Sequence, residues 1–185
     1  MQKIIALVLL ALISPLLIVI MLLLLFTTSC SPIFSQLRLG KDKKPFMIYK
    51  FRTMIKGADG LQSKYTVQNE ADGPVFKIRD DPRYTKVGRF LAHSGLDELP
   101  QLVNIIKGEM AFVGPRPLPI NEALKVPAKY ALRFSTLPGL TSLWVVQGSH
   151  SLSFKRWMEL DMEYIENRSI AVDIQIIGKT IWMLI

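Results

Sequence analysis

The chain begins with a long apolar run that needs surroundings other than water. Ile4 to Phe26 holds no charged residue, and only Ser14 and Pro15 interrupt its apolar side chains. A helix of about 20 apolar residues can cross the hydrocarbon layer, whereas the apolar core of a signal peptide is usually about 7–15 residues long. We therefore expect a membrane segment here rather than a cleaved leader.

Ser14 and Pro15 lie near the middle of this run. Proline removes one backbone hydrogen bond and bends a helix, and a serine hydroxyl can bond a freed carbonyl inside lipid. Each half, of about 11 residues, would reach only about 16 Å at about 1.5 Å per residue. Such halves suit a re-entrant hairpin that enters and leaves one leaflet. A kinked spanning helix explains the same residues, so the run alone leaves both arrangements open.

Basic residues indicate the orientation of the membrane segment. Lys3 is the only charged residue before the run, whereas several follow closely after it, namely Arg38, Lys41, Lys43 and Lys44. Positive charge gathers on the cytoplasmic side of membrane segments, so we expect the rest of the chain to be cytoplasmic. That remainder suffices for one hydrophobic core but not for two. We therefore predict a membrane anchor at residues 1–36 and a cytoplasmic domain at residues 37–185.

The charge balance narrows the classes of partner. The formal net charge is +8, and the excess of Lys and Arg lies in residues 37–89. A basic surface beside a membrane segment should attract phospholipid headgroups or anionic substrates. No nucleic-acid partner is expected, because the chain shows neither zinc-ligand spacing nor a base-reading basic helix. One cysteine cannot form an intramolecular disulfide, and two histidines alone cannot build a zinc site.

Two adjacent carboxylates, Asp97 and Glu98, open a segment whose apolar residues have helical spacing. These apolar residues are Leu96, Leu99, Leu102, Val103 and Ile106. The pattern predicts an amphipathic helix that ends at Lys107-Gly108, with Ser94 as its N-cap. Pro100 is compatible with such a helix only in its first turn.

Arg116 follows in the sequence Gly114-Pro115-Arg116-Pro117, where the prolines predict a stiff turn. A carboxylate pair that faces a fixed guanidinium suits phosphoryl chemistry with a divalent cation. An ordinary capped helix followed by a surface turn has the same residues. The spacing alone therefore leaves a phosphoryl-transfer site and a purely structural arrangement both open.

The remaining segments predict a helix-rich α+β fold. Alternation over Phe46–Met54, after a turn at Lys41–Pro45, indicates a strand. The expected helices are a short one at 85–92, an amphipathic one at 154–164 that faces the core, and a segment at 170–185 that could be helix or strand. Lys125, Lys129 and Arg133 recur every four residues and would form a basic ridge, either on the phospholipid surface or facing water.

These motifs together resemble the bacterial sugar transferase family, the monotopic phosphoglycosyl transferases. The resemblance rests on five segments: Ser14-Pro15, Lys50-Phe51-Arg52-Thr53-Met54, Asp81-Pro82-Arg83 with Gly88-Arg89-Phe90-Leu91, the block from Leu96 to Pro117, and Pro138-Gly139-Leu140-Thr141. It implies a re-entrant membrane helix-break-helix broken at Ser14-Pro15. It also implies a small cytoplasmic domain with a short β-hairpin and interfacial amphipathic helices, on the cytoplasmic face of the bacterial inner membrane.

The resemblance implies an enzyme that moves a sugar 1-phosphate from a nucleoside-diphosphate sugar, expected to be a UDP-sugar, to a polyprenyl phosphate. Asp97 would be the nucleophile, and Glu98 would hold Mg²⁺ together with it. Lys50, Arg83 and Arg116 would bind the substrate. A homo-oligomer is left open, as are the sugar, the nucleotide, the acceptor chain length and the glycan that the product starts.

Three positions depart from the family pattern. Ala92 stands where the family usually has Arg, and Ser149 stands where it usually ends a loop with Arg; Val145 in the same loop replaces Gln. His93 or Arg89 could supply the missing cation. The alternative function is a catalytically weak, membrane-anchored scaffold that binds nucleotide sugars or lipid phosphates.

Overall fold

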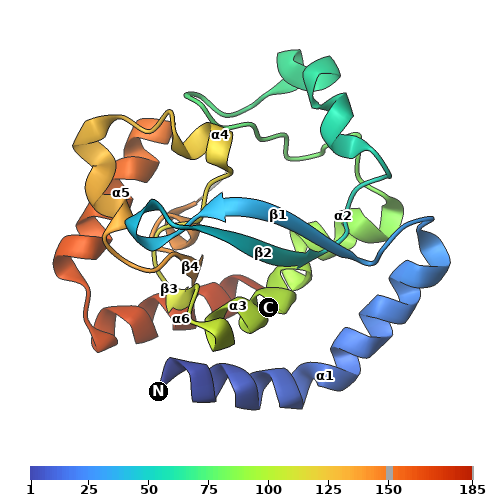
Figure 1. The fold of residues 1–185 in the computed structure, drawn as a ribbon, viewed down its shortest axis with the longest axis horizontal. Helices are drawn as coiled ribbons and strands as arrows, with labels where there is room; N and C mark the ends of the chain where they lie inside the picture. Colours follow the sequence, from blue (N-terminus) through green and yellow to red (C-terminus); the bar gives the residue numbers. More distant parts are fainter. Residues whose placement is uncertain (149–151, 185) are drawn as a thin grey trace.

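A computed structural model describes residues 1–148 and 152–184 of the chain. Its helices are α1 (Gln2–Thr27), α2 (Lys86–His93), α3 (Leu102–Lys107), α4 (Ile120–Ala123), α5 (Phe154–Asn167) and α6 (Ile170–Leu184). Its strands are β1 (Ile33–Leu39), β2 (Pro45–Phe51), β3 (Ala111–Val113) and β4 (Gly139–Thr141). Five 3₁₀ segments complete it: η1 (Lys41–Lys43), η2 (Ala58–Gln68), η3 (Leu96–Gln101), η4 (Ala128–Phe134) and η5 (Val145–Gln147). The predicted helix-rich α+β class is confirmed (Figure 1).

The β1–β2 hairpin crosses the middle of the molecule (Figure 1). The strands are antiparallel, from Ile33 opposite Phe51 to Leu39 opposite Pro45, and η1 forms the turn. The predicted strand and turn are confirmed, although β2 ends at Phe51 rather than Met54. The boundary expected after residue 36 falls inside β1, so the hairpin joins the two predicted parts.

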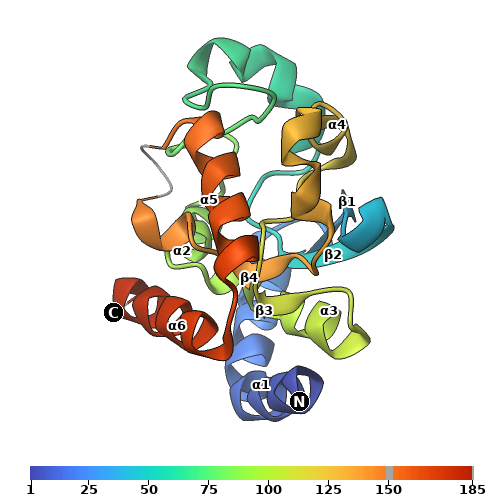
Figure 2. The same ribbon diagram turned by 90° about the vertical axis from the view of Figure 1, so that its left-hand side faces the viewer.

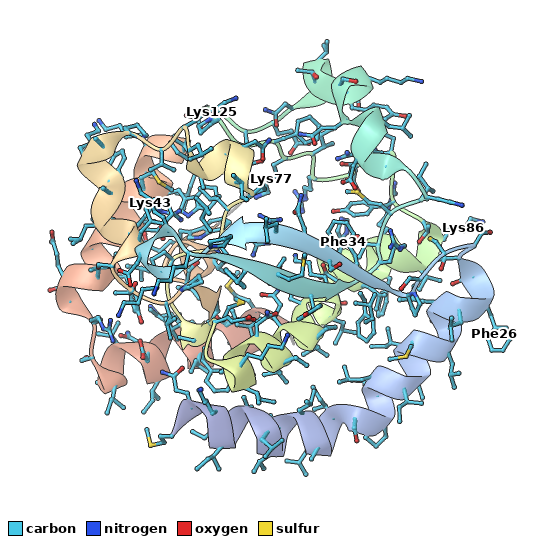
Figure 3. All side chains as sticks on the ribbon, in the orientation of Figure 1. Phe26, Phe34, Lys43, Lys77, Lys86 and Lys125 are labelled. Atoms are coloured by element: carbon cyan, nitrogen blue, oxygen red, sulfur yellow. The ribbon has the colours of Figure 1, made fainter. Side chains whose placement is uncertain are left out.

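The apolar run forms α1, which contains Pro15 and bends near its middle (Figure 1). The Ser14 hydroxyl donates to the carbonyl of Ala11 at 2.8 Å, as expected next to a proline kink. Among the described helices, α1 alone is long and apolar enough to cross a membrane. Phe26, at its C-terminal end, points away from the molecule (Figure 3).

One face of α1 packs on the rest of the chain. Ala6 lies in a core cluster with residues of β2 and α3, whereas Ile20 and Leu24 pack with Phe51 and Leu91. The opposite face leaves many large apolar side chains exposed, including Ile4, Val8, Leu12, Val19 and Leu22. The helix therefore has one face for protein and one that needs an apolar solvent.

The segment with the two carboxylates is helical, as predicted, but it starts as the 3₁₀ turn η3 before α3 continues it. Gly108 ends it in the left-handed region, at φ 84°. The expected N-cap was wrong. The Ser94 hydroxyl donates instead to the carbonyl of Phe90 at 2.8 Å, and Gly95, at φ 69°, begins η3.

A second, parallel pair of strands, β3 and β4, was not predicted. The two strands approach so closely that a Cβ on Gly139 would meet the backbone of Gly114. The predicted helix at 154–164 is confirmed as α5, with Phe154, Leu160 and Tyr164 buried. The last segment is the helix α6, which lies at the same end of the molecule as α1 and α3 (Figures 1 and 2).

The predicted basic ridge does not form. Lys125 and Lys129 are exposed, but Arg133 is buried within η4 and forms an ion pair with Asp161 of α5 at 2.9 Å. A guanidinium in the core needs such a carboxylate partner, and none lies near it in the sequence. The prediction of a basic ridge was wrong because the contact between Arg133 and Asp161 joins segments that are distant in the sequence.

Candidate active site

Three separate segments bring four of the predicted site residues together. Lys50 comes from β2, Asp97 and Glu98 from η3, and Arg116 from the turn after β3. Glu98 Oε1 lies 2.6 Å from Lys50 Nζ and 2.7 Å from Arg116 Nη2. Asp97 Oδ2 contacts Lys50 Nζ at 3.5 Å. We call these four residues the acid–base cluster.

The two carboxylates have different electrostatic surroundings. Burial alone would raise the pKa of Glu98, but the charges of Arg116 and Lys50 outweigh it and hold that pKa well below its usual range. Burial raises the pKa of Asp97 above 3.8; the charge of Lys50 opposes this shift, and Glu98 adds to it. Glu98 is therefore fixed as an anion, and Asp97 is the less strongly paired of the two.

A cavity of about 830 Å³ opens beside the cluster, within the usual size for small-molecule sites. Glu98 and Arg116 line it, whereas Asp97 and Lys50 are not among its lining residues. The side chain of Asp97 is one-tenth exposed. Asp97 therefore lies behind the cavity lining, next in the chain to Glu98, which lines the cavity.

Further cations line the same cavity. Burial and then the nearby charge of Arg116 lower the pKa of Arg38 to about 10 and that of Lys77 to about 8. Figure 3 shows Lys77 between α4 and the β1–β2 hairpin, whereas Lys125 lies at the outer edge. Cations that lower one another's pKa are stabilised by a bound anion. Sequence analysis missed Arg38 and Lys77 as site residues, and the basic excess in residues 37–89 was their only signal.

Two tryptophans form another wall of the cavity. Trp144 and Trp157 pack with ring centroids 4.4 Å apart and planes tilted by 35°. Within the described part of the chain, neither indole Nε1–H has a hydrogen-bond partner, and both nitrogens are buried. Buried indole N–H groups usually have an acceptor, so a polar ligand in this cavity would complete them. These residues were not predicted as site residues.

Arg83 does not join the acid–base cluster. Its Nη2 lies 2.6 Å from Asp81 Oδ2, its Nη1 donates to the carbonyl of Ala58 at 3.1 Å, and the residue is buried. These contacts attach η2 to the segment before α2. The substrate-binding role predicted for Arg83 therefore has no support from its contacts. Ser14 and Pro15 lie inside α1, which runs as one helix from Gln2 to Thr27, and the re-entrant break at these two residues stays a prediction.

The departures from the family pattern also have positions in the structure. Ala92 and His93 line the cavity. Arg89 does not line it, whereas both Arg89 and His93 lie 3.9 Å from Asp80, so of the two proposed substitutes His93 is the one that faces the cavity. Val145 lines the cavity as well. Ser149 lies outside the described residues.

The donor set near Glu98 fits a magnesium ion only in part. In residues 1–148 and 152–184, no cluster of three or more His, Cys, Asp and Glu side chains could hold a metal ion. Mg²⁺, however, is commonly held by one or two carboxylates together with substrate phosphates and water. Asp97 and Glu98 would therefore fit Mg²⁺ as a partner of a bound phosphate, but not as a permanently caged ion.

Comparison with known proteins gives relatives over most of the chain. The galactosyl transferase CpsE of Streptococcus agalactiae is 41% identical over 150 residues, which are 80% of this chain and 33% of that protein. The exopolysaccharide production protein ExoY of Sinorhizobium fredii is 36% identical over 182 residues, or 96% of this chain and 80% of that protein.

A third relative is the UDP-glucose:undecaprenyl-phosphate glucose-1-phosphate transferase of Klebsiella pneumoniae. It is 36% identical over an alignment that covers 97% of this chain and 38% of that protein. The chain thus spans about a third of some relatives and most of another. The family model for bacterial sugar transferases matches residues 1–185. The chain therefore belongs to the bacterial sugar transferase family.

Proposed function

We propose that this protein transfers a sugar 1-phosphate from a nucleoside-diphosphate sugar to a polyprenyl phosphate and so starts the assembly of a glycoconjugate. The observation that carries the proposal is the acid–base cluster at the edge of a cation-lined cavity, in a chain of this family. The relative from Klebsiella pneumoniae, by its name, uses UDP-glucose and undecaprenyl phosphate. We therefore propose a UDP-sugar as the donor.

The cavity suits the donor's diphosphate and its two polar ends. Arg116, Arg38 and Lys77 offer positive charge to the phosphate oxygens. Among the described residues the buried indole N–H groups of Trp144 and Trp157 have no acceptor, and we propose that carbonyl or hydroxyl oxygens of the nucleoside or the sugar supply one. Phosphate contacts hold the ligand, and directional donors set which ligand fits.

In the proposed first step, a carboxylate oxygen of Asp97 attacks the phosphorus that bears the sugar. The bond from that phosphorus to the bridging oxygen breaks, and the nucleoside monophosphate leaves with the electron pair. In the second step, an oxygen of the polyprenyl phosphate attacks the same phosphorus. The bond to Asp97 then breaks, which regenerates the carboxylate and leaves the sugar on a lipid diphosphate.

The chain's own cations prepare this chemistry. Lys50 and Arg116, now paired with Glu98, can turn to phosphate oxygens when the donor enters, because a phosphate competes well for a guanidinium. Glu98, which stays ionised, then remains available as an oxygen ligand for Mg²⁺. Bound to Asp97 or Glu98, Mg²⁺ would neutralise charge on the phosphates and favour the approach of a carboxylate.

The proposed setting is the cytoplasmic face of the bacterial inner membrane. In this arrangement α1 enters and leaves one leaflet at the Ser14–Pro15 bend, and its apolar face meets lipid. The parts at 1–36 and 37–185 would act as anchor and catalytic domain, with phospholipids around α1. A phosphate on a membrane lipid lies at headgroup depth, which explains why a polar site is tied to an apolar helix.

The test is the mass of the intact protein after incubation with a panel of nucleoside-diphosphate sugars and Mg²⁺, without acceptor. We expect one donor to add the mass of one sugar phosphate and to release one nucleoside monophosphate. Asp97→Asn should abolish both signals, whereas the matched surface variant Asp80→Asn should keep them. A full adduct on Asp97→Asn would refute the assignment of the nucleophile.

The second candidate function, a scaffold that binds without transfer, is favoured by one observation. Ala92 leaves the cavity wall without the arginine that the family pattern usually has there. Under this hypothesis the protein binds the donor in an equilibrium assay but forms no adduct with any member of the panel.

Repeating the incubation without Mg²⁺ tests the proposed cofactor, since the adduct should then form far more slowly.

A further inference from the structure

The same cavity has an apolar end, which we call the apolar arm. Its walls are Leu9 and Ile13 of α1 on one side and Ile177 and Ile181 of α6 on the other. Phe112 of β3 and Leu140 of β4 lie between the two helices. Figure 2 shows β3 and β4 above α1 and α6, at the end of the molecule where both helices lie.

The apolar arm is continuous with the polar end at the acid–base cluster. Leu99 lines the arm directly after Glu98 in the chain, and both residues line one cavity. On the other wall, the hydroxyls of Thr141 and Thr180 lie 2.7 Å apart and join β4 to α6. An apolar chain in the arm would therefore lead straight to the carboxylates and Arg116.

The mouth of the arm is exposed and apolar on both sides. Leu9 on α1 is 38% exposed, Ile181 on α6 is 53% exposed, and Met183 beside it is 55% exposed. Large apolar side chains on two facing helices do not favour an opening to water. The outer face of α1 is apolar too, so in the proposed membrane setting lipid would cover both this face and the residues of the mouth.

We propose that the apolar arm between α1 and α6 binds the first isoprenoid units of the lipid phosphate acceptor and guides its phosphate to the acid–base cluster. The charge pattern selects this occupant, because the cavity is apolar at its mouth and cationic at its inner end. A ligand with an apolar tail and an anionic head matches both ends, whereas a nucleotide sugar would leave the arm unfilled. This inference rests on the proposed function and adds the location of its second substrate.

The test separates the two half-reactions. Ile181→Trp and Leu9→Trp narrow the mouth, and each should raise the KM for polyprenyl phosphate by about tenfold or more, since several buried methylene contacts are lost. Release of nucleoside monophosphate in the absence of acceptor should stay at the wild-type rate. The matched controls, Ile174→Trp on α6 and Val8→Trp on α1, add the same side chain at exposed positions outside the cavity.

A photoreactive polyprenyl phosphate analogue gives a readout that does not depend on catalysis. A diazirine in its first isoprenoid units should label peptides of α1 and α6, and Ile181→Trp should reduce the labelling of both. Wild-type kinetics in both mouth variants would overturn the inference, as would equal losses in mouth and control variants or labelling elsewhere. If wild type released no nucleoside monophosphate but was still labelled at the arm, the proposed function would fail while the lipid site stood.

Discussion

Breaking the buried ion pair between Arg133 and Asp161 on one side only should be one of the most destabilising single changes in this fold. Both side chains are only 2% exposed, and Asp161 Oδ2 accepts from Arg133 Nη2 at 2.9 Å and from Nε at 3.1 Å. Arg133 Nη2 also donates to the carbonyl of Arg116 at 2.9 Å. The pair therefore supports the turn that carries a cation of the acid–base cluster.

Arg133→Met keeps the apolar contacts of the side chain but leaves Asp161 buried without its partner. Removing one member of a buried pair typically costs about 3–5 kcal/mol, and the lost bond to the Arg116 carbonyl adds about 1 kcal/mol. For a chain of this length, about 2–4 °C of melting temperature corresponds to 1 kcal/mol, so a total loss of about 4–6 kcal/mol should lower the melting temperature by roughly 8–24 °C. Thermal unfolding of the detergent-solubilised protein, followed by circular dichroism, measures it.

The loss should depend on pH. Burial raises the pKa of Asp161 from 3.8 to about 6, against the opposing charge of Arg133, and without Arg133 that pKa rises further. Between the unfolded and the folded pKa, the folded state binds more protons than the unfolded state. Its stability therefore falls as the pH rises. Below about pH 6 Asp161 is protonated in both folded proteins, so the deficit of Arg133→Met should shrink as the pH is lowered toward about 6 and change little below it.

The double variant Arg133→Met with Asp161→Leu is the control. Apolar residues of similar volume often replace a buried ion pair at little cost, so the double variant should melt well above the single one. A single variant that melts within about 2 °C of wild type would refute the reasoning, because the pair would then contribute less than 1 kcal/mol. A double variant no more stable than the single one would show that packing, not the unpaired charge, carries the loss.

Two further predictions concern the site and the membrane helix. Adduct formation should slow as the pH falls, with a midpoint above 3.8, because burial raises the pKa of Asp97 and only its carboxylate is a nucleophile. Initial rates of nucleoside monophosphate release measure this midpoint, and a value at or below 3.8 would contradict the prediction. Pro15→Ala should straighten α1 toward a spanning helix. A cysteine introduced by Gln2→Cys, in a Cys30→Ser background, should then react with a thiol label added on the other side of the membrane. Labelling that stays on the cytoplasmic side would count against the re-entrant arrangement.

The elements that sequence analysis predicted correctly are those with a local cause. Thr85 accepts from the Gly88 N–H at 2.9 Å and begins α2, and the periodic apolar residues of α5 face the core. Strand β2 and the turn before it follow from alternation and turn residues, whereas β1 was not predicted from its residue pattern. Such signals lie within one turn of helix or one pair of strands, so they can be recognised without knowledge of the rest of the chain.

The features that were missed depend on contacts between distant segments. Strands β3 and β4 are three residues each and pair in parallel across a long connection, which leaves no periodic pattern. Arg133 was placed on a surface ridge because its partner Asp161 lies 28 positions away. Lys77 lines the cavity only because η2 and the loop after it fold over the hairpin. No pattern among neighbouring residues predicts that this loop folds in that way.

The structure also indicates why two adjacent carboxylates would serve better than one. A carboxylate that holds two cations at 2.6 and 2.7 Å is a strong anchor but a poor nucleophile, since its lone pairs are already shared. Its neighbour has one contact at 3.5 Å and a raised pKa, so its oxygen is less stabilised and more reactive once ionised. Paired acids whose surroundings separate their pKa values commonly divide two roles between them. In the proposed mechanism Glu98 therefore holds Lys50 and Arg116 until the donor enters, and Asp97 is the residue that attacks.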